Sequence, residues 1–394
     1  MENAELSPVQ EWNILLILTG GTICTSVENG LRSLSSDTAE LRLTEDFRKS
    51  DSRFAGQVVF TPGRKFNTLS ENMTVAVWNE ILSYLRGMAP DFTSSRVRET
   101  SAHARSGKTF DGIIIAHGTD TLAYTAALFA LMLSGCSVPV FLVSSNAPLE
   151  MGEQIANGSV NFRAAVECVC GGMAPGVYVP YRNCDGRVWL HLAARLTQCG
   201  NYSEDFFSAG AIDITGFPHW GNGVFRNLHN RFPFHTRGNE PLPEVCQKKP
   251  LLCGLPGDLT DCVLKMTPYV GMNYRAYHLN GYRAVLHGSY HSGTACTGND
   301  CTNPHSILYL IDRCTETWTD IYISPARETA DGGVYDTVPV MLHYGGGKLR
   351  PLYGMTDEMT YAKLLIAYSH PEYFTPERRE AFLTCDFCGE MLSV

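Results

Sequence analysis

Two short clusters of threonine, glycine and aspartate contain the side chains in this sequence that are best suited to chemistry. The first is Thr19-Gly20-Gly21-Thr22, and the second, far along the chain, is Gly118-Thr119-Asp120-Thr121. A threonine hydroxyl is too weak an acid to attack a carbonyl unaided, so a nearby group must take its proton. The clusters therefore indicate nucleophilic chemistry; the simpler alternative is that their threonines only cap turns and helices.

Each cluster follows an apolar run that has the character of a buried strand. Asn13–Leu18 precedes the first cluster, and Gly112–Ala116 precedes the second. From Leu122 onward, apolar residues recur at helix spacing until Gly135. In open parallel sheets ligands bind at the carboxyl ends of strands, because helix N–H groups and helix dipoles point there. We therefore expect both clusters at that edge.

The composition allows two domains and argues against polyanionic partners. A chain of 394 residues with 44% apolar content can form two sizeable cores. A formal charge of −9 without a basic run argues against nucleic acid or an anionic membrane as the main partner. The first residues lack an apolar core of signal-peptide length, and no apolar run reaches membrane-spanning length. A cytoplasmic protein is the expectation.

The string TGGTI, followed later by HGTDTLAYTAALFALML, resembles the bacterial-type L-asparaginase family, and the second string is especially similar to its cytoplasmic type I branch. The resemblance continues more weakly through most of the chain. It implies an α/β fold with two doubly wound domains, a larger N-terminal parallel or mixed sheet domain and a smaller C-terminal domain. We place these domains at residues 1–235 and 250–394, with 236–249 as linker. It also implies a homodimer or homotetramer.

This resemblance assigns roles to the two clusters. Thr19 would attack the side-chain amide carbonyl of asparagine or a related amino-acid amide, and backbone N–H groups around Gly118 and Thr119 would stabilise the oxyanion. Thr119 and Asp120 would position or activate a water molecule that cleaves the acyl-enzyme. The family needs no cofactor or metal for this reaction, and none is expected here.

A third segment, Leu69–Met73, resembles the family's loop for the amino-acid head group. Ser70 would hold the α-carboxylate of the substrate, and Glu71 would pair with its ammonium group. Judged without the resemblance, Ser70 is a helix cap and Glu71 a solvated acid in the first turn.

Two positions depart from the family pattern. Leu31 stands where the family has a lid tyrosine, within a polar stretch, residues 31–52, that we interpret as a mobile connection. Gln198 stands where the family has its active-site lysine. A glutamine can hydrogen-bond the carboxylate of Asp120, but it brings no positive charge. Asp120 then loses its main reason to stay ionised in a buried site.

Three explanations for the missing lysine stay open. One is a slipped alignment, with a lysine reaching the site from position 108, 265 or 348. Another is an enzyme that acts on a different amide or a γ-glutamyl-like substrate, with water or Gln198 in the proton relay. The third is a chain that binds an amino acid or derivative without turnover.

Further expectations concern the second domain. Gly281–Ser289 is expected as a buried strand, Leu251–Leu255 as another, and Thr260–Thr267 as the start of a helix. The resemblance implies that an acidic residue of this domain reaches the site of a neighbouring subunit, with Glu328 or Asp331 as candidates. A candidate zinc site combines thiols with a histidine, against the simpler alternative of reduced cysteines: Cys296, Cys301, His305, Cys385 and Cys388.

Overall fold

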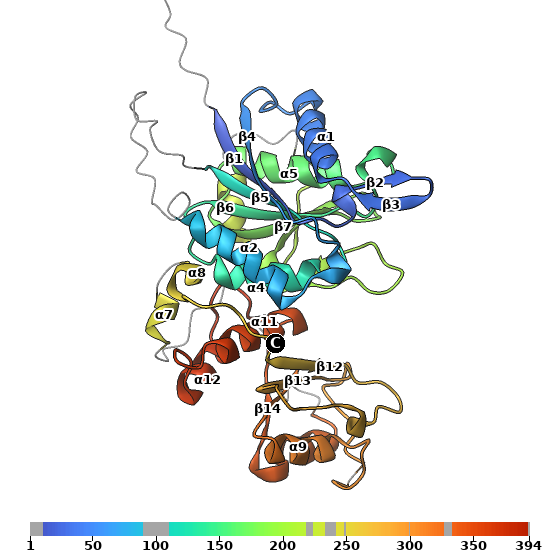
Figure 1. Ribbon diagram of the computed structural model, residues 1–394, viewed down its shortest axis with the longest axis vertical. Helices are drawn as coiled ribbons and strands as arrows, with labels where there is room; N and C mark the ends of the chain where they lie inside the picture. The colour runs from blue at the N-terminus through green and yellow to red at the C-terminus, as the bar shows by residue number, and fades with distance from the viewer. Residues whose placement is uncertain are drawn as a thin grey trace, which may run out of the picture. The chain divides into compact units, whose positions relative to one another are not determined.

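The computed structural model describes residues 11–89, 110–217, 224–232, 242–247, 250–298, 300–326 and 333–392. The chain divides into two compact units. The first comprises Met1–Ala126, Leu133–Ala193 and Gln198–Pro233, and the second comprises Ala127–Met132, Ala194–Thr197 and Phe234–Val394. Each unit has its own sheet with helices packed against it (Figure 1), so the expected α/β fold class is confirmed.

The first unit is built on a seven-stranded sheet with the strand order β11-β8-β7-β6-β5-β1-β4. Five of its strands run parallel: β1 (Trp12–Leu18), β4 (Val58–Lys65), β5 (Gly112–Ala116), β6 (Pro139–Val143) and β7 (Gly176–Arg182). Two antiparallel pairings extend the sheet on one side: β8 (Val188–Leu192) runs antiparallel to β7, and β11 (Ile212–Asp213) runs antiparallel to β8. The short strand β10 (Phe207–Ser208) also belongs to the first unit, whereas β9 (Leu196–Thr197) belongs to the second.

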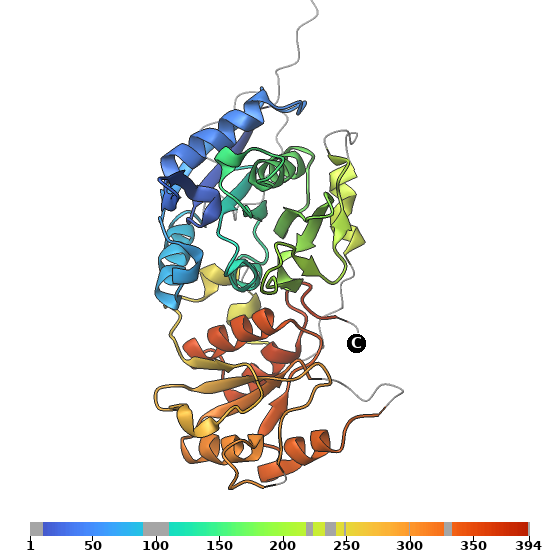
Figure 2. The same ribbon diagram turned by 90° about the vertical axis from the view of Figure 1, so that its right-hand side faces the viewer.

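Helices cover both faces of this sheet, and this is why its central strands are apolar throughout. Figures 1 and 2 show α1 (Ser36–Lys49) and α5 (Gly158–Cys170) on one face, with α2 (Val75–Gly87) and α4 (Leu122–Met132) on the other. Every residue of β5 and of β6 is buried. A strand that meets helices on both sides has no polar face to offer to water.

The order in which the chain adds strands to the sheet reverses between β1 and β5, although the two strands are parallel. From β1 the chain crosses to β4 on one side, whereas β5 leads through α4 to β6 on the other. Leu18 pairs with Ala116, and Ala116 pairs with Val143, so these three strands end level with one another. The loops that follow them therefore meet at a topological switch point, where ligands bind in open α/β sheets.

The prediction that residues 31–52 form a mobile connection is wrong. Thr25–Glu28 (β2) and Leu31–Leu34 (β3) form an antiparallel hairpin, with positive φ angles of 51° and 78° at Asn29 and Gly30. Helix α1 follows at once. Its buried residues Ala39, Leu43 and Phe47 recur every fourth position, a helical period that the polar composition of the segment conceals.

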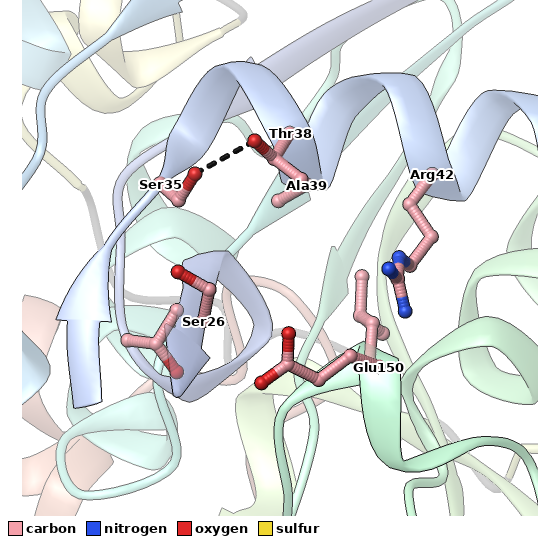
Figure 3. Close-up of a pocket in the computed structure, with 8 residues that line it drawn as sticks. Ser26, Ser35, Thr38, Ala39, Arg42 and Glu150 are labelled. Atoms are coloured by element: carbon pink, nitrogen blue, oxygen red, sulfur yellow. Dashed lines mark hydrogen bonds between the residues drawn. The ribbon is translucent and has the colours of Figure 1, made fainter. Parts of the chain in front are cut away.

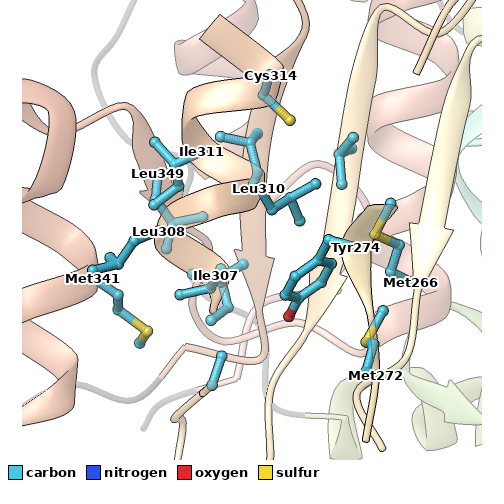
Figure 4. Close-up of a cluster of buried hydrophobic side chains, with 14 of the residues drawn as sticks. Met266, Met272, Tyr274, Ile307, Leu308, Leu310, Ile311, Cys314, Met341 and Leu349 are labelled. Carbon is cyan, nitrogen blue, oxygen red and sulfur yellow. The ribbon is translucent and has the colours of Figure 1, made fainter. Parts of the chain in front are cut away.

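The second unit has a four-stranded parallel sheet in the order β12-β13-β14-β15. Its strands are Val263–Met266, Ala284–Gly288, Asp320–Ser324 and Leu349–Pro351. Its longer helices are α9 (Ile307–Glu316), α10 (Thr337–His343), α11 (Asp357–Ser369) and α12 (Pro376–Thr384). Figure 4 shows the core of this unit, in which Ile307 and Ile311 of α9 lie among apolar residues that include Met266 of β12 and Met341 of α10.

Short segments of this unit show where expectations failed. The strand expected at Gly281–Ser289 is confirmed as β13, but Leu251–Gly254 is the short helix α8, and Val263–Met266 is a strand inside the segment expected to begin a helix. The short helix α7 (Glu244–Gln247) also belongs to this unit, whereas α6 (Val224–Leu228) belongs to the first. None of the helices in the described ranges combines the length and the apolar character needed to cross a membrane.

A buried ion pair joins α11 to the segment after α12. The Nζ atom of Lys363 lies 2.6 Å from Oε1 of Glu390, and both side chains have no exposed surface. Lys363 also donates to the carbonyls of Phe382 and Cys385, at 3.1 and 2.6 Å. Burial by itself would raise the pKa of Glu390, but the charge of Lys363 and backbone N–H donors from Phe387 and Cys388 lower it to about 2.

Lys363→Met should lower the free energy of unfolding by about 3–5 kcal/mol, because it leaves the carboxylate of Glu390 buried without its cation. Urea unfolding followed by circular dichroism measures this. The double variant Lys363→Met/Glu390→Gln should cost less than Lys363→Met alone, since no charge is then buried. Lys49→Met removes a surface pair with Glu45 and is the control that should change little. Equal losses for Lys363→Met and Lys49→Met would contradict the importance of the buried pair.

Candidate active site

A cavity of about 440 Å³ lies in the first unit beside the turn that follows β5. Its lining includes Thr119, Asp120 and Gln198 from the predicted site, together with residues that carry no sequence motif: Asn146, Tyr181, Cys199, Gly200, Asn201, Tyr202, Ser203, Glu204 and Phe206. The charged groups among these lining residues are the two carboxylates of Asp120 and Glu204. The cavity therefore offers negative charge and neutral hydrogen-bonding groups to a ligand.

Three segments that are distant in sequence meet at backbone level next to this cavity. A Cβ atom added to Gly21 would lie 2.1 Å from the Cα atom of Gly118, so the turns after β1 and β5 are in direct backbone contact. A Cβ atom added to Gly118 would lie 2.4 Å from the Oγ atom of Ser70. The structure thus brings together the TGGT turn, the HGTD turn and the head-group loop, as the switch-point geometry requires.

Thr19 lies within this junction but not in the lining of the cavity. Its side chain is buried, and its hydroxyl donates a hydrogen bond of 2.9 Å to the carbonyl of Ala116. Its backbone is held as well, because its N–H donates to Ala116 and its carbonyl accepts from the N–H of Thr68. Only the χ1 torsion is available to turn the hydroxyl toward a ligand. The hydroxyl must therefore leave Ala116 before it can attack.

Ser70 is hydrogen-bonded to the turn after β5. Its hydroxyl donates to Oδ2 of Asp120 at 2.9 Å, and it accepts the N–H of Asp120 at 3.3 Å. Its carbonyl accepts the hydroxyl of Thr121 at 2.9 Å. The side chain that caps α2 is Thr74, whose hydroxyl accepts the N–H of Val77, so Ser70 does not serve as that cap. Glu71, next to Ser70, is exposed.

Asp120 does not have the buried surroundings that the sequence predicts, and Gln198 is hydrogen-bonded to the turn that contains Asp120. Asp120 is exposed, so the expectation of a carboxylate in a buried site is wrong. The amide of Gln198 donates to the carbonyl of Thr119 at 2.8 Å and accepts the N–H of Ala123 at 3.2 Å. Gln198 therefore ties the turn to the first residues of α4. A lysine here could donate to Thr119 but could not accept from Ala123.

A hydrogen bond to an acidic side chain of another loop holds the hairpin formed by β2 and β3. Oε1 of Glu150, in the turn Leu149–Met151, accepts the N–H of Val27 at 2.6 Å. Figure 3 shows Glu150 and Arg42 of α1 beside Ser26 of the hairpin, around a cavity of about 10 Å³. Such a volume holds at most about one water molecule. Leu31, which the sequence predicts to stand at the family's tyrosine position, has 75% of its surface exposed.

Of the other residues predicted to reach the active site, only Lys265 and Lys348 are described, and neither lines the cavity of about 440 Å³. Glu328, Asp331 and Lys108 lie outside the described residues. Lys265 pairs with Asp357 at 3.3 Å within the second unit, and Lys348 is exposed there. Throughout the described ranges, no group of three or more His, Cys, Asp or Glu side chains is arranged to hold a metal ion, and the cysteines of the candidate zinc site form no disulfide.

Comparison with known sequences gives a consistent result. The family model described as asparaginase, N-terminal, matches residues 13–216. A glutamyl-tRNA(Gln) amidotransferase subunit of Pyrococcus furiosus is 31% identical over 402 residues, covering 98% of this chain and 79% of the relative. The protein of the same name from Thermoplasma volcanium is 29% identical over 206 residues, which cover 50% of this chain and 43% of that relative.

Comparison with solved structures extends the likeness to both units. The thermostable L-asparaginase of Thermococcus kodakarensis has a TM-score of 0.65 at 21% identity, covering 97% of this chain and all of that one. L-asparaginase I of Vibrio cholerae has a TM-score of 0.61 at 20% identity, with the same coverage. At these identities the structures show a shared fold. Together, fold and relatives support an enzyme of amidohydrolase or amidotransferase type. With a family model over more than half of its length and a relative that is 31% identical over 98% of this chain, the chain belongs to the asparaginase family.

Proposed function

We propose that this chain hydrolyses the side-chain amide of asparagine, glutamine or a derivative of either, with Thr19 as nucleophile. The observation that supports this most is the convergence of Thr19, Ser70 and the Thr119 turn at the switch point of the sheet. Each segment contributes what amide hydrolysis by a hydroxyl requires: a nucleophile, a carboxylate beside a second hydroxyl, and backbone N–H donors.

The reaction proceeds in two steps. The Oγ atom of Thr19 attacks the amide carbonyl carbon, an ester bond to Thr19 forms, the C–N bond breaks, and the hydroxyl proton departs with the ammonia or amine. The N–H of Thr119 stabilises the oxyanion of each tetrahedral intermediate. Water, positioned by Thr119 and Asp120, then cleaves the ester and releases the acid. Thr19 must first rotate away from Ala116, so substrate binding has to displace a hydrogen bond of 2.9 Å.

The head group of the substrate is an amino acid with its ammonium group intact. Glu71 is an exposed carboxylate beside Ser70, and the charged residues that line the cavity, Asp120 and Glu204, are acids as well. Carboxylates in this number favour a ligand that carries positive charge. Ser70 would exchange its bond to Asp120 for one to the substrate's α-carboxylate.

Two alternatives follow from specific observations. Because Gln198 supplies no charge and the hydroxyl of Thr19 is bonded to Ala116, the chain would bind amino acids without turnover if that rotation never occurs. Because relatives are named amidotransferase subunits, the ammonia could pass to a partner chain instead of to solvent. A homodimer or homotetramer and a cytoplasmic location stay predictions.

Thr19→Ala should reduce amide hydrolysis at least about 1,000-fold, because it removes the nucleophile. Ammonia and amine release is measured over a panel of asparagine, glutamine and their N-substituted and γ-linked derivatives. Thr19→Ser keeps a hydroxyl and should retain measurable turnover. Both variants should keep the circular dichroism spectrum of the wild type, since at most one hydrogen bond is lost. Full activity in Thr19→Ala would exclude Thr19 as nucleophile.

Gln198→Lys should raise kcat for asparagine by roughly 10-fold or more, because it places a cation beside the carboxylate that assists proton transfer. Gln198→Met is the matched control: it loses the hydrogen bonds of the amide to Thr119 and Ala123 without adding charge, and should lower turnover. Steady-state kinetics at neutral pH distinguish the two. If wild type already hydrolyses asparagine with ordinary turnover and Gln198→Lys is slower, the equivalence of position 198 with the family lysine is wrong.

A further inference from the structure

A buried hydrogen-bonded chain runs from α2 through α4 to the turn that carries Thr119. The Nε1 atom of Trp78 donates to the hydroxyl oxygen of Thr125 at 3.0 Å. That hydroxyl lies 2.9 Å from Nε2 of His117, and Nδ1 of His117 lies 2.8 Å from the carbonyl of Gly118. His117 and Thr125 have no exposed surface, and Trp78 has 6%. The mechanism proposed above uses none of these three side chains.

The hydrogen bonds of this chain can run in one direction only. A carbonyl oxygen only accepts, so Nδ1 of His117 must carry a proton to bond Gly118. Burial lowers the pKa of His117 to about 4, with opposing effects from the bond to Gly118 and the charge of Asp120, so the ring is neutral at pH 7. Its Nε2 then accepts from Thr125, and Thr125 accepts from the indole of Trp78, which only donates.

The peptide bond between Gly118 and Thr119 transmits this arrangement to the cavity. A trans peptide is planar, so its N–H points away from its C=O. The carbonyl of Gly118 faces the buried ring of His117, and the N–H of Thr119 therefore points away from that ring. Thr119 lines the cavity, and its N–H has no hydrogen-bond partner among the described residues.

The next peptide is held from other directions. The carbonyl of Thr119 accepts from Gln198, and the N–H of Asp120 donates to Ser70. Both peptide planes that flank Thr119 are thus fixed by side chains. Position 118 has no room for a side chain, because a Cβ atom there would lie 2.4 Å from Oγ of Ser70.

We infer that Trp78, Thr125 and His117 form a positioning chain that holds the N–H of Thr119 toward the ligand's carbonyl oxygen. This inference rests on the proposed function, since it concerns the oxyanion donor of that reaction. The three residues are positioning residues, because they act through the Gly118 carbonyl and do not touch the substrate. A donor that is preorganised costs no reorientation when charge develops on the oxygen.

Thr125→Val tests the chain, because valine keeps the shape of threonine and removes the hydroxyl. It should lower kcat by about 10- to 100-fold, somewhat less than loss of an oxyanion donor, while KM stays within about 3-fold. Thr125→Ser restores the hydroxyl and should recover most of kcat. Trp78→Phe removes the indole N–H together with part of the ring volume, and should lower kcat less than Thr125→Val, which gives a second test should Thr125→Val fail to fold. Unchanged kcat in folded Thr125→Val, or no recovery in Thr125→Ser, would overturn the inference.

Nuclear magnetic resonance spectra test the hydrogen bonds of Trp78, Thr125 and His117 without a measurement of turnover. Long-range ¹H–¹⁵N spectra of the full chain labelled at its 12 histidines report the tautomer of each ring. The ring whose Nε2 signal shifts in Thr125→Val is His117, and wild type should show it protonated at Nδ1 alone at pH 7. Protonation at Nε2, or at both nitrogens, overturns the inference.

Failure of the proposed function has a different signature. If wild type releases no ammonia or amine from any amide, the proposed function fails while the tautomer result stands. The positioning role is then judged by the backbone amide signal of Thr119 in ¹H–¹⁵N spectra, which asparagine or glutamine should shift in Thr125→Ser as in wild type and clearly less in Thr125→Val. Equal shifts in the two variants would overturn it.

Discussion

The contact between the backbones of Gly21 and Gly118 is the constraint on which this site depends. Neither residue has room for a Cβ atom, since one added to Gly21 would lie 2.1 Å from Gly118 and one added to Gly118 would lie 2.9 Å from Gly21. Any other amino acid would separate the two turns. Separation would move the nucleophile candidate Thr19 away from the Thr119 turn, and would also displace Ser70, which packs against Gly118. Sheet register, with Leu18 opposite Ala116, places the two turns at the same level.

Much of this arrangement could be predicted from the sequence, because it follows from the apolar character of the strands and from their parallel pairing. Ile113, Ile114 and Ile115 leave no face for water, so the strand had to be central and covered on both sides. Once two such strands are parallel neighbours, the residues that follow them lie together at one edge. The likeness of the TGGTI and HGTDT strings to a known family pointed to the same edge independently.

The remaining features depend on tertiary contacts that no local pattern encodes. Val263–Met266 is too short for its apolar residues to distinguish a strand from a helix, and its pairing with β13 decides the matter. The exposure of Asp120 and the partners of Gln198 depend on how the segment 198–206 lies against the turn. Likewise, Thr125 was visible in the sequence only as part of an apolar helix, although it links His117 to Trp78.

The predicted replacement of the family lysine by Gln198 would be less severe here than the sequence suggests. A lysine is needed most where a carboxylate is desolvated, but Asp120 is exposed and accepts a hydrogen bond from Ser70. It also lies just before the first turn of α4, where helix N–H groups favour negative charge. Gln198 then contributes to the geometry of the turn and not to its charge. Its amide joins the carbonyl of Thr119 to the N–H of Ala123, while His117 holds the peptide bond between Gly118 and Thr119. Two neutral side chains thus orient the turn from opposite ends, so the contribution of this site to catalysis is expected to come from fixed backbone dipoles more than from a neighbouring cation.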